Sequence, residues 1–153
     1  MSPAYPKPGP RPKTAGKRSR AQVNEIRPMV ELRDDYRCVV SGTDYGKTSP
    51  CTPGLTMQHR VGRGAGGSAL FDGPAYLLTM CQHHNTLETA SADFAAVCLT
   101  NGWKLHRNRV DVVPALVPVR YWDGWYLLEQ DSCARWRITA AEAARLTAKG
   151  VPS

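Results

Sequence analysis

The fold is decided by residues 55–88, which read LTMQHRVGRGAGGSALFDGPAYLLTMCQHHNTLE. The run Leu55–His59 predicts a short strand, and Ala75–Met80 is apolar enough to predict a buried second strand. Between them, the four glycines of residues 59–68 exclude regular structure. From about His83 the apolar residues follow helical spacing. The order is therefore strand, glycine loop, strand, helix.

Upstream of this stretch, the sequence predicts one helix and one further strand. A Ser-x-x-Gln spacing at residues 19–22 is typical of a helix start. Pro28 either kinks this helix or begins a shorter one that ends near Asp34, and the shorter helix is favoured. Tyr36–Val40 predicts a strand, and residues 41–54, rich in Gly, Ser, Thr and Pro, predict a long hairpin loop.

Downstream, the sequence predicts a hairpin followed by a helix. Asp123-Gly124 supplies the positive φ angles of a tight turn between Val117–Trp122 and Trp125–Glu129. Arg135–Ile138 is expected to add a third strand, and the Thr139–Glu142 spacing predicts a capped final helix. The predicted fold class is therefore α+β, with a short helix before the central strands and a C-terminal β-hairpin plus helix.

Length and charge suggest one basic domain with an anionic partner. The 153 residues suit a single core, and 20 Lys and Arg against 13 Asp and Glu give a formal charge of +7. Residues 1–20 hold six bases and no acid, which predicts a disordered, basic, proline-rich arm. We expect residues 21–102 to form the core and residues 103–153 an extension packed on it.

Several classes of protein are excluded by composition. No apolar run is long enough to cross a bilayer, so no membrane partner is expected. The N-terminus lacks the apolar stretch of a secretory signal, which predicts a cytoplasmic protein without disulfides. Five cysteines without a CxxC pair do not form a four-cysteine zinc ribbon, so any metal site must recruit other ligands.

The histidines are the most informative residues. His59 ends the first central strand, and the pair His83-His84 begins the helix that follows the second. Imidazoles at facing ends of a strand and a helix could converge, giving a metal site or a base beside a metal. The alternative is that they are ordinary surface or packing residues.

Five short motifs occur in a fixed order along the chain. They are RDDYRC at residues 33–38, QHR at 58–60, RGAGGS at 63–68, PAYLL at 74–78 and CQHHNTLE at 81–88. This ordered set resembles the HNH (ββα-metal, His-Me finger) endonucleases, specifically those encoded by phages of actinobacteria. Residues 101–103, 118–119 and 124–128 look like the C-terminal extension of that group, so the resemblance covers about residues 25–130.

The resemblance implies a ββα-metal finger that clamps one Mg²⁺ or Mn²⁺ ion against the scissile phosphate of double-stranded DNA. His59 then occupies the place of the general base that takes a proton from water, and His84 the place of the metal ligand on the helix. The implied activity is hydrolysis of DNA phosphodiesters in the host cytoplasm, beside the large subunit of the phage packaging terminase.

The register of the last motif residue is open. Glu88, four positions after His84, favours His84 because the family has an acid there on the same helical face, but Asn85 is the alternative. His83 falls where related proteins keep a zinc-binding cysteine, so imidazole is expected to replace thiolate as a ligand.

Two positions depart from the family pattern. Gln58 stands where the family has an Asp or His metal ligand, and an amide oxygen can bind the ion without contributing charge. Tyr76 stands at the position of the family's middle asparagine, where its hydroxyl is expected to tie the catalytic loop only in part.

A non-cleaving nucleic-acid-binding protein of the same fold is therefore the alternative function, and an assembly protein that uses the basic arm is a third.

Structural zinc is left open. Cys38, Cys81 and His83 could gather an ion with Cys51 or water, or the thiols could pack as small apolar groups.

Arg60 and Arg63, beside the glycine loop, are expected to bind DNA phosphates. The alternative is a mobile surface loop.

Overall fold

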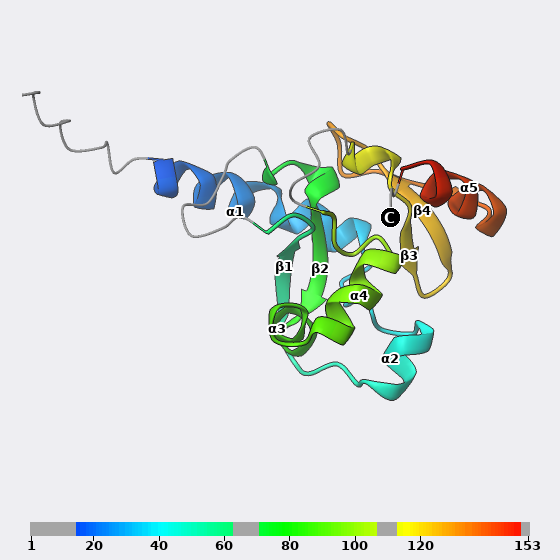
Figure 1. Cartoon of the computed structure of the whole chain (residues 1–153). Coiled ribbons are helices and arrows are strands. Elements are labelled where there is room, and N and C mark those ends of the chain that lie inside the picture. Colours follow the sequence, from blue (N-terminus) through cyan, green and yellow to red (C-terminus); the bar gives the residue numbers. More distant parts are fainter. Residues whose placement is uncertain (1–14, 63–70, 107–112, 151–153) are drawn as a thin grey trace, which may run out of the picture.

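The computed structural model describes residues 15–62, 71–106 and 113–150 of the chain, and these residues form a mixed α+β fold (Figure 1). The helices are α1 (Ala15–Arg33), α2 (Asp44–Thr48), α3 (Gln82–Ala90), α4 (Ala92–Thr100) and α5 (Ala140–Gly150). The strands are β1 (Leu55–His59), β2 (Leu77–Cys81), β3 (Val119–Tyr121), β4 (Gly124–Leu128) and β5 (Arg135–Ile138). The α+β class expected from the sequence is confirmed.

An antiparallel hairpin lies at the centre of the molecule. β1 pairs with β2 so that Leu55 lies opposite Cys81 and His59 opposite Leu77. α3 begins directly after β2, and we call β1, β2 and α3 the hairpin–helix unit. The strand expected at Leu55–His59 is confirmed. The second strand begins two residues later than expected, because Pro74–Tyr76 form a single 3-10 turn ahead of it.

The first helix is longer than expected. α1 runs from residue 15 to residue 33 with Pro28 inside it, so the favoured short helix is wrong. The lost hydrogen bond at Pro28 is outweighed by packing of the last turns, where Val30 is fully buried and Arg33 nearly so. Residues 15–20 of the expected disordered arm are helical, and residues 1–14 lie outside the described residues.

Residues 36–40 do not form the expected strand. Asp35 and Tyr36 both have φ angles of 53°, a left-handed conformation that turns the chain away from α1. Val39 nevertheless reaches the central hairpin, because its N–H donates to the carbonyl of Thr79 at 2.9 Å. The expected long loop after it contains α2, whose N-terminus is capped by the Thr43 hydroxyl.

The helix expected after β2 is two helices. Ser91 ends α3 and caps α4, since its hydroxyl accepts from the N–H of Phe94 at 3.2 Å. The helix is interrupted at Ser91 because serine strongly favours the N-cap position of a new helix. In Figure 1 the two helices lie together at one end of the central hairpin.

The C-terminal strands and helix expected from the sequence are confirmed, but the predicted turn at Asp123-Gly124 is wrong by one residue. Tyr121 pairs with Gly124, so Trp122 and Asp123 form the turn, and Asp123 does not have the expected positive φ angle. β3, β4 and β5 form a three-stranded antiparallel sheet, and α5 follows it directly. Thr139 and Glu142 form the expected capping box, with each side chain accepting from the backbone N–H of the other at 3.1 and 2.8 Å. The described part of residues 103–153 shares one core with the preceding part, because Tyr121 and Leu128 belong to the same buried cluster as Met80.

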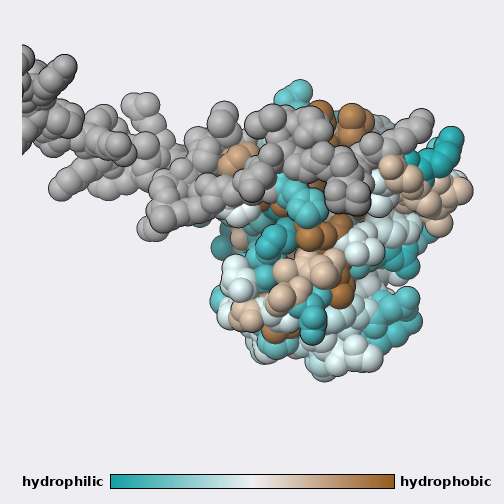
Figure 2. Space-filling view, in the orientation of Figure 1, coloured by the Kyte–Doolittle hydropathy of each residue, from teal (hydrophilic) through white to brown (hydrophobic). Residues whose placement is uncertain are grey.

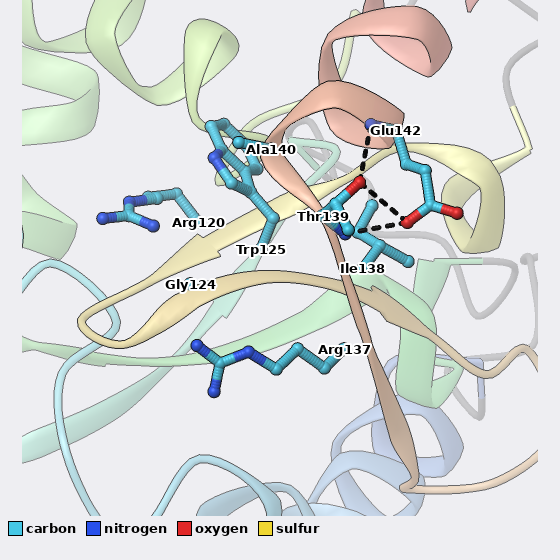
Figure 3. A pocket seen from close by; sticks show the side chains of 8 residues that line it. All are labelled: Arg120, Gly124, Trp125, Arg137, Ile138, Thr139, Ala140 and Glu142. Atoms are coloured by element: carbon cyan, nitrogen blue, oxygen red, sulfur yellow. Dashed lines mark hydrogen bonds between the residues drawn. The ribbon is translucent and has the colours of Figure 1, made fainter.

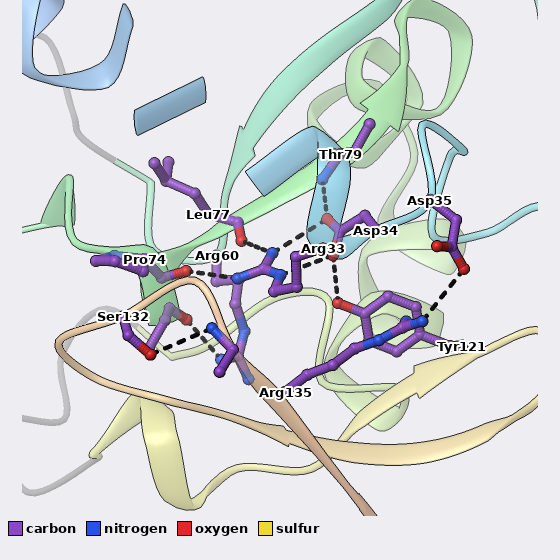
Figure 4. Close-up of polar contacts among 12 residues, drawn as sticks. Arg33, Asp34, Asp35, Arg60, Pro74, Leu77, Thr79, Tyr121, Ser132 and Arg135 are labelled. Carbon is purple, nitrogen blue, oxygen red and sulfur yellow. Dashed lines mark hydrogen bonds and ion pairs between the residues drawn. The ribbon is translucent and has the colours of Figure 1, made fainter. Parts of the chain in front are cut away.

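A buried ionic network joins α1 to both sheets (Figure 4). Asp34 is fully buried and accepts hydrogen bonds from the Arg33 guanidinium at 2.8 Å, the Thr79 N–H at 2.8 Å and the Tyr121 hydroxyl at 2.7 Å. Burial first, and then the neighbouring Asp34 carboxylate, raise the pKa of Tyr121. The phenol therefore stays protonated and keeps donating to Asp34 at neutral pH.

The guanidinium of Arg60 lies fully buried between the central hairpin and the C-terminal part. It donates to four backbone carbonyls, at distances of 2.8 to 3.1 Å: those of Ala75, Gly102, Pro114 and Val117. Burial lowers its pKa to about 9, so it remains charged at neutral pH. Arg60 is thus a cross-link made of hydrogen bonds.

Within the described residues, no helix is both long and apolar enough to cross a membrane. On the face shown in Figure 2, hydrophobic and hydrophilic residues are interspersed.

We expect Arg60→Met to lower the free energy of unfolding by about 3–5 kcal/mol, because it leaves several buried carbonyls without donors. Urea unfolding followed by circular dichroism measures the change. Arg145→Met, at an exposed position of α5, is the matched control and should change stability by less than about 0.5 kcal/mol. A loss below about 1 kcal/mol for Arg60→Met would contradict the cross-link.

Candidate metal centre and histidine site

Three cysteines and one histidine converge at the end of the central hairpin where α3 begins. Their ligand atoms, those of Cys38, Cys51, Cys81 and His84, all lie within 4.8 Å of one another. Cys38 comes from the turn after α1, Cys51 from the segment after α2, Cys81 from the end of β2, and His84 from the first turn of α3. This cluster, the Cys3His cluster, could hold a metal ion.

The spacing of the cluster suits a tetrahedral ion. The His84 Nδ1 atom lies 3.5, 3.7 and 3.1 Å from the Sγ atoms of Cys38, Cys51 and Cys81. Zinc bonds of about 2.3 Å to sulfur and about 2.0 Å to nitrogen, at a tetrahedral angle, place the two ligand atoms about 3.5 Å apart. Three thiols with one imidazole are also a donor set that soft and borderline cations prefer.

The residues around the cluster favour the neutral form of His84 and orient its imidazole ring. The Ser49 hydroxyl lies 3.1 Å from His84 Nε2, the contact that usually fixes the second nitrogen of a metal-binding histidine. Burial, and then the neighbouring His83, lower the pKa of His84. A neutral imidazole with Nδ1 facing the thiols is the form that binds a metal.

The thiols of the cluster differ in acidity. Burial raises the pKa values of Cys38 and Cys51. Burial also opposes ionisation of Cys81, but hydrogen bonds from the His84 and Thr52 backbone and from the other two cysteines outweigh it and lower its pKa. Of the three thiols, Cys81 therefore ionises most easily to the thiolate form that binds a metal ion.

His59 lies at the other end of the hairpin, in a separate site. Its Nε2 atom is 2.9 Å from Oδ1 of Asp72, whose side chain is fully buried, while 17% of the His59 side chain is exposed. Asp72 stands two residues before the 3-10 turn at Pro74–Tyr76. The pair therefore combines a solvent-accessible imidazole with a buried carboxylate.

The expected convergence of His59 and His84 is not observed. His59 pairs with Leu77, four residues along β2 from Cys81, which is a separation of about 13 Å along the strand. Nδ1 of His84 faces the three thiols instead. The start of α3 follows Cys81 and the end of β1 is His59, and the antiparallel register places these two positions at opposite ends of the hairpin.

The other two expected metal ligands, Gln58 and His83, differ in exposure and in their contacts. Gln58 is buried, and its Nε2 donates to the carbonyl of His59 at 3.1 Å. His83 is exposed, and its backbone N–H donates to the Thr52 hydroxyl at 3.2 Å. Because His84 faces the thiols at the other end of the hairpin, it does not join Gln58 beside His59 as the expected ligand set requires. Asn85 contacts β1, since its amide donates to the Thr56 hydroxyl at 2.8 Å.

The remaining expected site residues have different outcomes. Tyr76 packs its ring edge-on against Phe71, with centroids 5.4 Å apart, and its carbonyl accepts from the N–H of Arg60 at 2.7 Å. Tyr76 thus contacts Phe71 through its ring and the residue after His59 through its backbone. Arg60 cannot bind DNA phosphates in this structure, because its side chain is buried and bound to carbonyls. Arg63 lies outside the described residues.

A hollow of about 510 Å³ lies where α5 meets the C-terminal sheet, lined by Arg120, Trp125, Arg137 and Glu142 among others (Figure 3). Arg120 lies opposite Trp125 in the strand register, whereas Arg137 is one residue from the Ile138 that pairs with Trp125. The two arginines therefore project from opposite faces of the sheet. They do not form a joint anion site.

The sequence did not identify Asp72. It offered Cys38, Cys51 and Cys81 as possible ligands of one structural ion, but with His83, whereas the structure brings His84 to the thiols. The spacing of Cys81 and His84, with two residues between them like the ligands of a zinc knuckle, was the local signal for His84. Asp72 follows the glycine-rich loop without any periodic pattern, so only its burial beside His59 identifies it.

The chain matches no family model, no curated protein and no solved structure among those compared.

We expect the purified protein to carry one tightly bound metal ion per chain and to lose at least about 10 °C in Tm when a chelator removes it, since metal binding contributes directly to folding. Elemental analysis and thermal unfolding measure the metal content and the change in Tm.

Cys51→Ala should abolish tight metal binding, because it removes one of four ligands at an exposed position. Cys133→Ala, a partly exposed cysteine outside the cluster, should bind the metal normally. Equal metal content in both variants would rule the cluster out.

Proposed function

We propose that this protein is an HNH-type endonuclease that hydrolyses phosphodiesters of double-stranded DNA. His59 is the general base that takes a proton from the attacking water. The water oxygen then bonds to phosphorus as the bond to the sugar oxygen breaks, and the departing sugar oxygen takes a proton from solvent. The observation that carries the proposal is the accessible His59 imidazole beside buried Asp72, at the end of the first strand of a strand–strand–helix unit.

The position of His59 suits this role. It ends β1, and the next residue, Arg60, is locked by its backbone and side chain into the surrounding carbonyls. A base must be held at a fixed place relative to a substrate, because small displacements reduce the rate strongly. The motif order that resembles the HNH endonucleases supports the same assignment.

The Cys3His cluster is assigned a structural role under this proposal, with zinc as the ion. Three cysteines and a histidine complete four-fold coordination and leave no open position for a substrate, which is typical of structural zinc. Cys38 after α1, Cys81 at the end of β2 and His84 in α3 would hold the ion and so be joined through it. His84 is then no ligand of a catalytic ion, and Asn85 becomes the last residue of the motif.

The charge of the chain supports DNA as the partner. A formal charge of +7 with six bases in residues 1–20 favours encounter with a polyanion. The terminase large subunit is the protein partner that the resemblance implies. Co-purification of the two proteins in the presence of nuclease would distinguish direct contact from bridging by DNA.

A second candidate is a non-cleaving DNA-binding protein of the same architecture. It is favoured by one observation: His84 is committed to the thiols and Gln58 is buried, so the expected set of catalytic metal ligands does not assemble.

The two candidates differ in a plasmid assay. Supercoiled DNA is incubated with the metal-loaded protein in buffers containing Mg²⁺ or Mn²⁺, and nicked and linear products are counted. We expect His59→Ala to reduce cleavage by about 100-fold or more, the usual contribution of a general base, with DNA affinity changed less than about threefold as measured by gel shift. His106→Ala, at an exposed histidine, is the matched control and should cut normally.

Each outcome selects one interpretation. Salt-dependent binding without any cleavage by the wild type would support the non-cleaving protein. Cleavage that persists in His59→Ala would remove His59 as the base. A wild-type protein that neither binds nor cuts DNA would contradict both candidates.

A further inference from the structure

Asp72 is built into the protein as the partner of His59. Its side chain is fully buried, and its Oδ1 lies 2.9 Å from His59 Nε2. The two backbone segments that carry the pair are tied together next to it. The N–H of Arg60 donates to the carbonyl of Tyr76 at 2.7 Å, and the N–H of Tyr76 donates to the carbonyl of Gly73 at 3.0 Å. The separation of imidazole and carboxylate is therefore set by the fold.

The pair determines which nitrogen of His59 carries the proton. A neutral imidazole has one N–H and one lone pair, and an ionised carboxylate can only accept a hydrogen bond. With Asp72 facing Nε2, the N–H must be on Nε2, and the basic lone pair is then on Nδ1. The carboxylate favours this choice, because it can accept a hydrogen bond from Nε2–H but cannot donate one to an Nε2 lone pair.

We propose that Asp72 is a positioning residue that holds His59 as the Nε2–H tautomer and directs its Nδ1 lone pair to the attacking water. This inference rests on the proposed endonuclease function. A carboxylate that orients a histidine base in this way acts on the rate of the chemical step more than on substrate binding. A residue that merely tied the loop would affect stability and leave the tautomer unchanged.

The test combines a spectroscopic readout with a kinetic one on the full-length, metal-loaded chain. Nitrogen-15 labelling of the four histidines reports the protonated nitrogen of each ring, at a pH where the rings are neutral. His59→Gln identifies the His59 signal by its loss. We expect wild-type His59 to be the Nε2–H tautomer. In Asp72→Asn, a nearly isosteric change, we expect a mixture or the Nδ1–H form, because an amide can also donate to Nε2.

In the plasmid assay, Asp72→Asn should lower kcat about 10- to 100-fold, with the DNA dissociation constant changed less than about threefold. Asp44→Asn, whose side chain is almost fully exposed, is the matched control and should match the wild type in both readouts. Thermal unfolding confirms that Asp72→Asn is folded under assay conditions.

The outcomes separate this inference from the proposed function. Wild-type His59 in the Nδ1–H form would overturn the inference, and so would a folded Asp72→Asn protein with unchanged tautomer and unchanged kcat. If the wild type cuts no DNA but His59 is Nε2–H and changes in Asp72→Asn, the endonuclease proposal fails while the positioning by Asp72 is supported.

Discussion

The buried guanidinium of Arg60 is the interaction on which the rest of the structure depends. Its acceptors belong to the segment before β2, the turn after α4 and the segment ahead of β3. A buried cation costs several kcal/mol unless every donor is satisfied, so these segments must be in place together. Arg60 also follows His59 directly. The same contacts that join the central hairpin to the C-terminal sheet therefore fix the end of the strand on which the candidate base lies.

The histidines of this chain are divided between two tasks at opposite ends of one hairpin. His84 faces three thiols, and a histidine used in this way cannot also serve at a phosphate. The candidate chemistry is consequently concentrated at His59 and its buried partner Asp72, away from the cluster. This division explains why one helix start can carry two adjacent histidines with very different environments: His84 is buried, whereas His83 is exposed.

The parts of the fold that could be predicted are those with local causes. The strand at residues 55–59, the existence of the C-terminal hairpin and the cap at Thr139 each follow from a few adjacent residues. The long α1 and the turn at residues 35–36 depend on packing against distant segments, so propensity alone misplaced them. The site was harder still. Arg60 has the sequence context of a surface arginine, and only carbonyls up to 57 residues away make it a core residue.

The two ends of the central hairpin are held by different kinds of bond. At the Leu55–Cys81 end the Cys3His cluster gathers thiols, which respond to oxidants and metal supply. At the His59–Leu77 end the Arg60 hydrogen bonds respond to neither. Local unfolding caused by oxidation or by loss of metal should therefore begin at the cluster and extend toward His59. The candidate base lies at the end of the hairpin that is farthest from the cluster.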